Sequence, residues 1–115
     1  MSIDRTIKEW QEAIHANAKE HGWWPKGKKR NFGEMCMLMV SELSESFEEF
    51  REHGEATNFY LGKDGKPEGI AVEMGDVIIR ILDWAEHAGV DMGVIMERKH
   101  EYNETRSFRH GGKHA

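Results

Sequence analysis

The sequence predicts an all-α protein, a four-helix bundle that assembles as a homo-oligomer. Four segments repeat apolar residues at helical spacing, and no segment shows the alternation of a half-buried strand. Both prolines, Pro25 and Pro67, fall between those segments. The chain has 115 residues, of which 38% are hydrophobic. A chain of this size and polarity has little room for a core, so we expect self-association to bury more apolar surface.

The composition narrows the possible functions. A net charge of −5 disfavours nucleic acid and anionic membranes as partners. No apolar run reaches the ~18–20 residues of a membrane span, and the first residues lack a signal-peptide pattern. A single cysteine excludes an internal disulfide framework. We therefore expect a cytoplasmic protein with one domain, residues 1–115, whose residues from about 105 to 115 form a basic C-terminal tail.

The first two helices are separated by a basic loop. The first is expected over residues 4–21, where Trp10 belongs to an apolar face and is expected in the core. The second is expected up to His53 and begins at Asn31, which can act as its N-terminal cap. Glu34, three residues after Asn31, stands in the capping-box position.

A connection over residues 54–68 precedes the third helix. Its length exceeds that of an ordinary turn in a helical bundle, which indicates a mobile or a functional loop. The third helix is expected from about Gly69 to Ala88. Asp91 can cap a fourth helix that reaches about Glu104.

Two pairs of acidic residues carry the strongest chemical signal. Glu42 and Glu45 are three residues apart on the second helix, so they share one face. Glu73 and Asp76 have the same spacing on the third helix. Both pairs border the apolar side of their helix. If the two helices pack antiparallel, the four carboxylates repel one another, and an oxygen-preferring divalent cation such as Mg²⁺ relieves that repulsion.

A plainer interpretation is that these acids are solvated surface residues. Charged residues make up 32% of the chain, so some pairs with this spacing arise by chance. From Glu42 to Asp76, however, ten acidic residues are accompanied by only three basic ones. Two pairs on consecutive helices with so few basic partners favour metal ligands, one of which can accept a proton from a bound water.

Basic groups that suit a phosphate lie outside the acidic helices. Lys99, Asn103 and Arg106 are spaced by four and three residues, so they can share one face of the fourth helix. Two cations and an amide can hold phosphate oxygens and the edge of a base or sugar. Cations near a helix C-terminus are also favoured without any ligand, so this signal alone is weak.

Two further positions complete the predicted site. Arg80 lies one turn after Asp76 and is a second candidate for a phosphate contact. Trp24, like its neighbour Trp23, lies in the basic loop and can stack on a base. An acidic metal cluster with separate basic groups suits a polyphosphate, because the cation neutralises phosphate charge while the basic groups stabilise the leaving portion.

The acids form the motif Glu42-x-x-Glu45, followed after 27 residues by Glu73-x-x-Asp76. The residues that flank these acids make the motif a more specific signal than the acids alone. The segments 41–51, 70–77 and 99–113 resemble the MazG-like, all-α nucleoside triphosphate pyrophosphohydrolases. The resemblance implies hydrolysis of a nucleoside or deoxynucleoside triphosphate to the monophosphate and pyrophosphate. It implies Mg²⁺ as cofactor, with Mn²⁺ as a substitute, and a homodimer or homotetramer.

The same resemblance assigns roles to individual residues. It implies the four acids of the motif as metal ligands and catalytic residues. It implies Lys99, Asn103 and Arg106 as substrate contacts, and places Asn17 or a neighbouring tryptophan beside the base. Two other interpretations stay open. The acids can form a docking surface on a non-catalytic helical protein, or the same chemistry can act on another phosphorylated nucleotide, such as an alarmone.

Overall fold

The computed structural model describes residues 4–54 and 57–106. The helices are α1 (Ile7–Glu20), α2 (Phe32–His53), α3 (Ile70–His87) and α4 (Met92–Thr105). The strands β1 (Tyr60–Leu61) and β2 (Pro67–Glu68) pair antiparallel around the 3₁₀ turn η1 (Lys63–Gly65). The all-α class is therefore confirmed, apart from this small hairpin, which the sequence did not predict. The part of the predicted basic tail that follows Arg106 lies outside the described residues.

The helix starts follow local capping. The Asn31 and Asp91 side chains each accept a hydrogen bond from the backbone amide three residues later, as predicted for α2 and α4. Helix α1 begins at Ile7 instead of Asp4, because Thr6 and Glu9 form a reciprocal capping box there. The periodic apolar pattern extends one turn upstream of this cap, which explains the difference.

Helix α3 begins without a side-chain cap. The backbone carbonyls of Thr57 and Asn58 accept hydrogen bonds from the amides of Ile70 and Ala71, at 3.0 and 3.1 Å. Gly69 allows this close approach: its φ is +122°, and an added Cβ would lie 2.5 Å from the Asn58 carbonyl oxygen. The long connection therefore folds back onto the start of the helix that carries Glu73.

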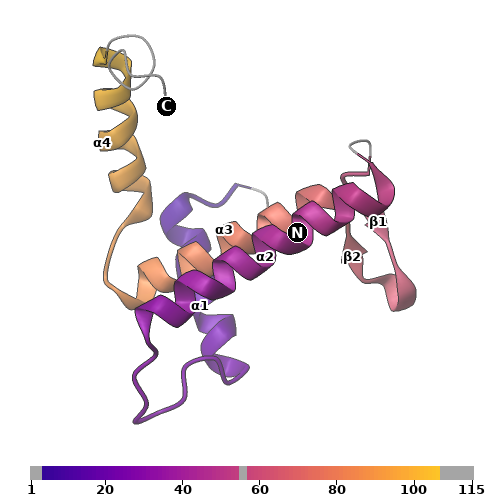
Figure 1. Cartoon of the computed structure of the whole chain (residues 1–115). Helices are drawn as coiled ribbons and strands as arrows, with labels where there is room; N and C mark the ends of the chain where they lie inside the picture. The colour runs from indigo at the N-terminus through magenta and orange to yellow at the C-terminus, as the bar shows by residue number, and fades with distance from the viewer. Residues whose placement is uncertain (1–3, 55–56, 107–115) are drawn as a thin grey trace.

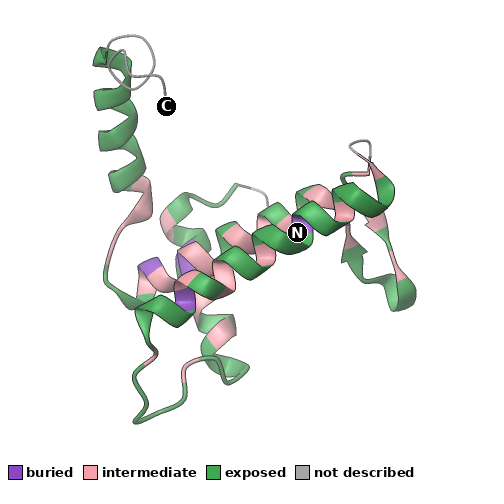
Figure 2. Cartoon of the chain, viewed as in Figure 1, coloured by how far each residue is buried: buried purple, intermediate pink, exposed green. Residues whose placement is uncertain are grey.

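Helices α2 and α3 run antiparallel side by side, and α1 crosses the C-terminal half of α3 (Figure 1). Ser46 of α2 lies beside the start of α3 and donates to the Ile70 carbonyl at 3.5 Å. The buried apolar core is small and lies where the three helices meet (Figure 2). Among the described residues it consists of Met35, Leu82 and Ala85.

Gln11 of α1 fixes the turn between α3 and α4. Its side chain is fully buried, and Nε2 donates to Glu86 Oε1 at 2.9 Å and to the Val90 carbonyl at 2.7 Å. Its Oε1 accepts from the Met92 amide at 3.1 Å. Beyond this turn, α4 extends away from the other three helices (Figure 1). A closed four-helix bundle is therefore not confirmed within one chain.

The single chain leaves much apolar surface in contact with solvent. Its radius of gyration is 16.8 Å, whereas a compact chain of this length has about 13 Å. Its accessible surface is 9122 Å², against about 6,450 Å² for a compact monomer of this mass.

Within the described residues, no helix is both long and apolar enough to cross a membrane.

An apolar groove between α2 and α3 accounts for part of this surface. We call it the α2–α3 groove; its volume is about 390 Å³, and it is lined by Leu43, Ser46, Phe47, Phe50, Asn58, Ile70 and Met74. Leu43, Phe47 and Phe50 are exposed on α2, and Met74 is exposed on α3. The α2–α3 groove is therefore a large apolar surface without a cover inside the described chain.

Candidate metal centre and adjoining cavity

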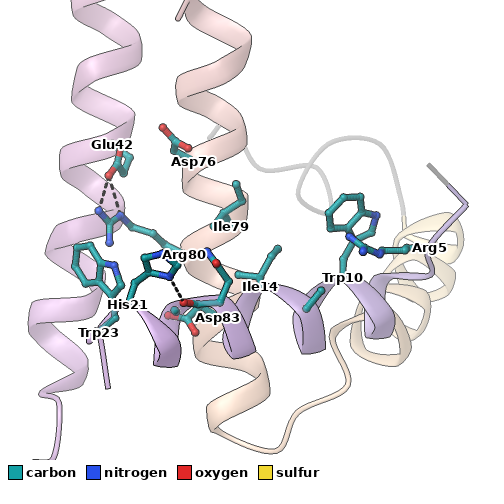
Figure 3. Close-up of a pocket in the computed structure, with 13 residues that line it drawn as sticks. Arg5, Trp10, Ile14, His21, Trp23, Glu42, Asp76, Ile79, Arg80 and Asp83 are labelled. Carbon is teal, nitrogen blue, oxygen red and sulfur yellow. Dashed lines mark hydrogen bonds and ion pairs between the residues drawn. The ribbon is translucent and has the colours of Figure 1, made fainter. Parts of the chain in front are cut away.

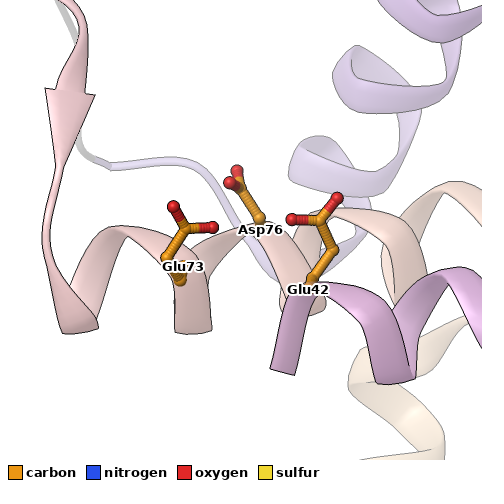
Figure 4. A group of neighbouring side chains, drawn as sticks. All are labelled: Glu42, Glu73 and Asp76. Carbon is orange, nitrogen blue, oxygen red and sulfur yellow. The ribbon is translucent and has the colours of Figure 1, made fainter. Parts of the chain in front are cut away.

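Three carboxylates converge where α2 and α3 pack. Glu42 projects from α2 toward Glu73 and Asp76 of α3, and one oxygen of each lies within 4.8 Å of the others (Figure 4). The antiparallel pairing of the two helices produces this convergence, and the spacing of three residues puts Glu73 and Asp76 on one face. These distances suit carboxylate oxygens that share one small cation.

The negative charges of this cluster are only partly balanced by the protein, through the ion pair between Arg80 and Glu42. The pKa of Glu73 is raised to about 7, first by burial, then by a hydrogen bond with Glu45 and by the charges of Glu45, Asp76 and Glu42. Burial and the Glu42 charge also raise the pKa of Asp76, although Arg80 opposes that shift. The cluster therefore favours a bound proton or a bound cation near neutral pH.

One oxygen of the cluster has no partner. Glu73 Oε2 is buried, and it is the sole such side-chain atom without a hydrogen bond among the described residues. A buried carboxylate oxygen without a donor is costly, and a divalent cation satisfies it directly. The donor set is made of oxygens alone, which fits Mg²⁺ or Mn²⁺. Glu42, Glu73 and Asp76 are thus the residues that would hold the ion.

Glu45, the fourth predicted ligand, lies at the edge of this group. It is exposed on α2, yet close enough to Glu73 to raise that residue's pKa. The three-residue cluster does not include it. Its assignment as a metal ligand therefore stays a prediction, whereas the other three acids are brought together.

Arg80 is engaged with one of the acids. Its Nε and Nη2 lie 2.8 and 2.6 Å from the same oxygen, Glu42 Oε1 (Figure 3). Its guanidinium carbon also lies 5.0 Å from the centroid of the Trp23 ring. Arg80 is therefore placed at the cluster as predicted, but here it binds a carboxylate, and its contact with phosphate stays a prediction.

A cavity of about 620 Å³ opens directly beside the acids (Figure 3). Glu42 and Asp76 form one end of its lining, and Asn17 of α1 contributes an amide. The remaining lining is largely aromatic, aliphatic and basic: Arg5, Trp10, Ala13, Ile14, Ala18, His21, Trp23, Ile79, Arg80 and Asp83. Asn17 thus lines the same cavity as two of the acids, and its predicted place beside a base stays a prediction.

One tryptophan of this cavity, Trp10, was expected in the core and not at the site. Trp10 is 37% exposed and lies under the Arg5 guanidinium at 4.7 Å, so its predicted burial in the core is wrong. The helical stripe Trp10, Ile14, Asn17 and His21 was a usable signal, because residues at this spacing share one face of α1. The small size of the core leaves that face in contact with the cavity.

Trp24 has a different environment from Trp23. Its Nε1 donates to both carboxylate oxygens of buried Asp83, and its ring stacks on His87 with centroids 4.1 Å apart. The lining of the cavity includes Trp23 and not Trp24. Trp24 therefore anchors the basic loop to α3, and Trp23 is the tryptophan of this loop that faces the cavity.

The basic residues of α4 are not brought to the acids within one chain. Lys99 and Arg106, the residue that caps the end of α4, both lie over the Tyr102 ring, at 5.0 and 5.8 Å from its centroid. Asn103 is exposed on the same helix. Since α4 extends away from α2 and α3 (Figure 1), their role as substrate contacts stays a prediction.

No protein family, curated protein or solved structure matches this chain. The chemistry of the site is therefore inferred from its own residues and from the motif resemblance. Three carboxylates suited to a cation adjoin a cavity with aromatic walls and an amide. Such a site can hold a charged group at the acids and a flat, partly apolar group in the cavity.

Proposed function

We propose that this chain is a Mg²⁺-dependent nucleoside triphosphate pyrophosphohydrolase that forms a monophosphate and pyrophosphate. The observation that carries the proposal is the juxtaposition of the three acids with the aromatic cavity. Phosphate oxygens joined to the cation would lie beside Glu42, Glu73 and Asp76, while the base would lie between α1 and Trp23. The motif resemblance to MazG-like enzymes supports the same assignment and places the activity in control or cleansing of nucleotide pools.

The residues of the chain have defined roles in this reaction. Glu42, Glu73 and Asp76 would hold the cation, with Glu45 as a further ligand or neighbour. When bound, Mg²⁺ supplies charge neutralisation for the phosphates and acidifies a coordinated water. A carboxylate of the cluster that the cation does not fully engage can accept the proton of the attacking water. Water adds to phosphorus, and the bond between the α- and β-phosphates breaks.

The cavity limits the kind of substrate. Its volume of about 620 Å³ is sufficient for a nucleoside, and Trp10 and Trp23 offer ring surfaces for a base. Asn17 can form hydrogen bonds with a base edge or a sugar hydroxyl, because its amide both donates and accepts. An alarmone or another phosphorylated nucleotide would use the same acids and the same cavity. The base and the sugar are therefore left to experiment.

A homodimer or homotetramer is part of the proposal. The exposed α2–α3 groove and the excess accessible surface support burial against a second copy. An extended α4 can then reach a neighbouring subunit and complete a four-helix bundle there. Lys99, Asn103 and Arg106 would approach the neighbour's acids and bind its substrate's phosphates. The single free cysteine, Cys36, and a nucleotide substrate are consistent with the cytoplasm as the compartment.

The proposal is tested by phosphate release from a panel of nucleoside triphosphates with Mg²⁺, with and without added inorganic pyrophosphatase. Phosphate that appears only with the helper enzyme identifies pyrophosphate as the product. Glu73→Gln is expected to lower turnover at least about 100-fold while the helices stay folded. Glu48→Gln is the matched control, because Glu48 is an exposed α2 glutamate paired with Arg51.

Other results would contradict the proposal in distinct ways. Phosphate release without the helper enzyme would mean that a terminal phosphate is cleaved. No hydrolysis of any triphosphate would favour another phosphorylated nucleotide or a non-catalytic protein that binds a basic partner through its acids. Full turnover by Glu73→Gln would remove this residue from the site.

A further inference from the structure

We infer that Arg80 is a positioning residue that couples the cation site to the Trp23 wall of the cavity. The inference rests on the proposed function, because it takes the three acids as the place where a cation binds. Arg80 contacts Glu42 with two of its nitrogens and lies against the Trp23 ring with its guanidinium group. One side chain therefore touches both the acid that binds the ion and the aromatic wall.

The contact with Glu42 is one-sided. Both Arg80 nitrogens bind Oε1, which fixes the Glu42 carboxylate and leaves Oε2 outside this contact. The Glu42 and Arg80 side chains are only 13% and 25% exposed, so this pair is partly shielded from water. Partners that hold a ligating carboxylate in this way commonly determine metal affinity, because they select the productive orientation of the ligand.

The contact with Trp23 is the second half of the coupling. Trp23 is 46% exposed, and its ring lies near two guanidinium groups, those of Arg80 at 5.0 Å and Arg30 at 5.9 Å. Its neighbour Trp24 is held by hydrogen bonds to Asp83, so the loop backbone is anchored beside Trp23. The Arg80 guanidinium contacts the Trp23 ring directly, whereas the backbone of the loop is held by Trp24. A shift of the Arg80 side chain is therefore expected to move the Trp23 ring and to leave the loop backbone in place.

A simpler role for Arg80 is to neutralise the charge of Glu42. This role predicts the opposite effect of an Arg80 substitution on cation affinity. If Arg80 only cancelled negative charge, its loss would strengthen cation binding, since a competing positive charge would be removed. Lysine would then replace it without effect. Positioning instead requires a planar group that binds one oxygen with two nitrogens and stacks on a ring, which lysine does not provide.

The experiment uses the full chain without nucleotide. Free Mn²⁺ is measured by electron paramagnetic resonance to obtain the dissociation constant, and tryptophan emission is followed while Mg²⁺ is added. The wild-type chain is expected to bind Mn²⁺ and to change its emission with Mg²⁺, and Trp23→Phe is expected to lose most of that change. Both Arg80→Lys and Arg80→Gln are expected to weaken Mn²⁺ binding about tenfold and to lose the emission change.

The controls separate the possible failures. Arg51→Gln breaks an exposed arginine–glutamate pair on α2 and is expected to behave as the wild type. Circular dichroism verifies that each variant is folded, and Arg80→Lys serves if Arg80→Gln is not. Unchanged or tighter Mn²⁺ binding by the Arg80 variants would overturn the coupling and leave the proposed function standing. No Mn²⁺ binding by the wild type would overturn both.

Discussion

The indole nitrogen of Trp24 donates to both oxygens of Asp83, at 2.9 and 3.0 Å. His15 Nδ1 lies 2.7 Å from one of these oxygens, and Arg30 lies 3.9 Å from the other. A single carboxylate of α3 therefore joins α1 to the basic loop that follows it. Since Trp23 belongs to this loop, the same carboxylate determines where one wall of the cavity stands.

Asp83→Asn is expected to destabilise the chain by about 2–3 kcal/mol. The amide presents a donor toward groups that are themselves donors, so a buried hydrogen bond is lost without replacement. Urea unfolding followed by circular dichroism measures the loss. Glu48→Gln, which breaks the exposed pair with Arg51, is expected to change stability by less than about 0.5 kcal/mol. Equal effects of the two substitutions would contradict the anchoring role.

The metal-free chain is expected to lose stability as the pH rises from about 5 to above 7. The pKa of Glu73 is raised from 4.5 to about 7 in the folded chain, so the folded state holds a proton that the unfolded state releases. This contribution is complete below pH 4.5 and lost as the pH passes the folded value. We expect a fall on the order of 2 kcal/mol, reduced by partial solvent screening.

Urea unfolding in the presence of a chelator, at several pH values, measures this dependence. Glu73→Gln is expected to flatten it, because the amide does not titrate. Added Mg²⁺ is expected to restore stability at high pH, since a bound cation stabilises the ionised cluster. A wild-type profile that rises with pH in the same range would show that Glu73 is not the residue in control.

If the proposed oligomer forms through the α2–α3 groove, Phe47→Glu is expected to dissociate it. Phe47 lines the α2–α3 groove and is exposed in the single chain, so a charge there would be buried at the interface without a partner. Light scattering coupled to size-exclusion chromatography measures the mass. Phe59→Glu is the matched control, because Phe59 is equally exposed but does not line the groove. An unchanged mass for Phe47→Glu would move the interface to another surface.

Subunits with different defects are expected to complement each other. If Arg106 of one subunit serves the acids of another, Arg106→Ala and Glu73→Gln are each impaired alone. A mixed dimer then holds one intact site, and a random equal mixture regains about a quarter of wild-type turnover. The measurement is pyrophosphate release after the two variants are unfolded and refolded together. No gain on mixing would place each complete site within one subunit.

Capping residues and apolar spacing predicted the helices well, because both signals are local. Asn31 and Asp91 were identified as caps, and the structure places them there. The hairpin was missed because strands of two residues carry no periodic pattern. Helix α1 was extended too far upstream because the capping box at Thr6 was overlooked.

The candidate site was predictable to the extent that it depends on helical faces. Spacing alone was enough to propose that Glu42, Glu73 and Asp76 meet, given an antiparallel pair of helices. The sequence did not show which of Trp23 and Trp24 faces the cavity, because two adjacent loop residues are distinguished only by their tertiary contacts. Asp83 of α3 binds the Trp24 side chain, and this contact comes from a residue far along the chain from the loop.

The direction of α4 is encoded by a single primary amide. Gln11 donates to the Glu86 carboxylate and the Val90 carbonyl while it accepts from the Met92 amide, and no other neutral side chain of this length offers donors and an acceptor together. Glutamate at this position would face two acceptors with a negative charge. The direction in which α4 leaves the other helices is thus specified in α1, the same helix that lines the cavity.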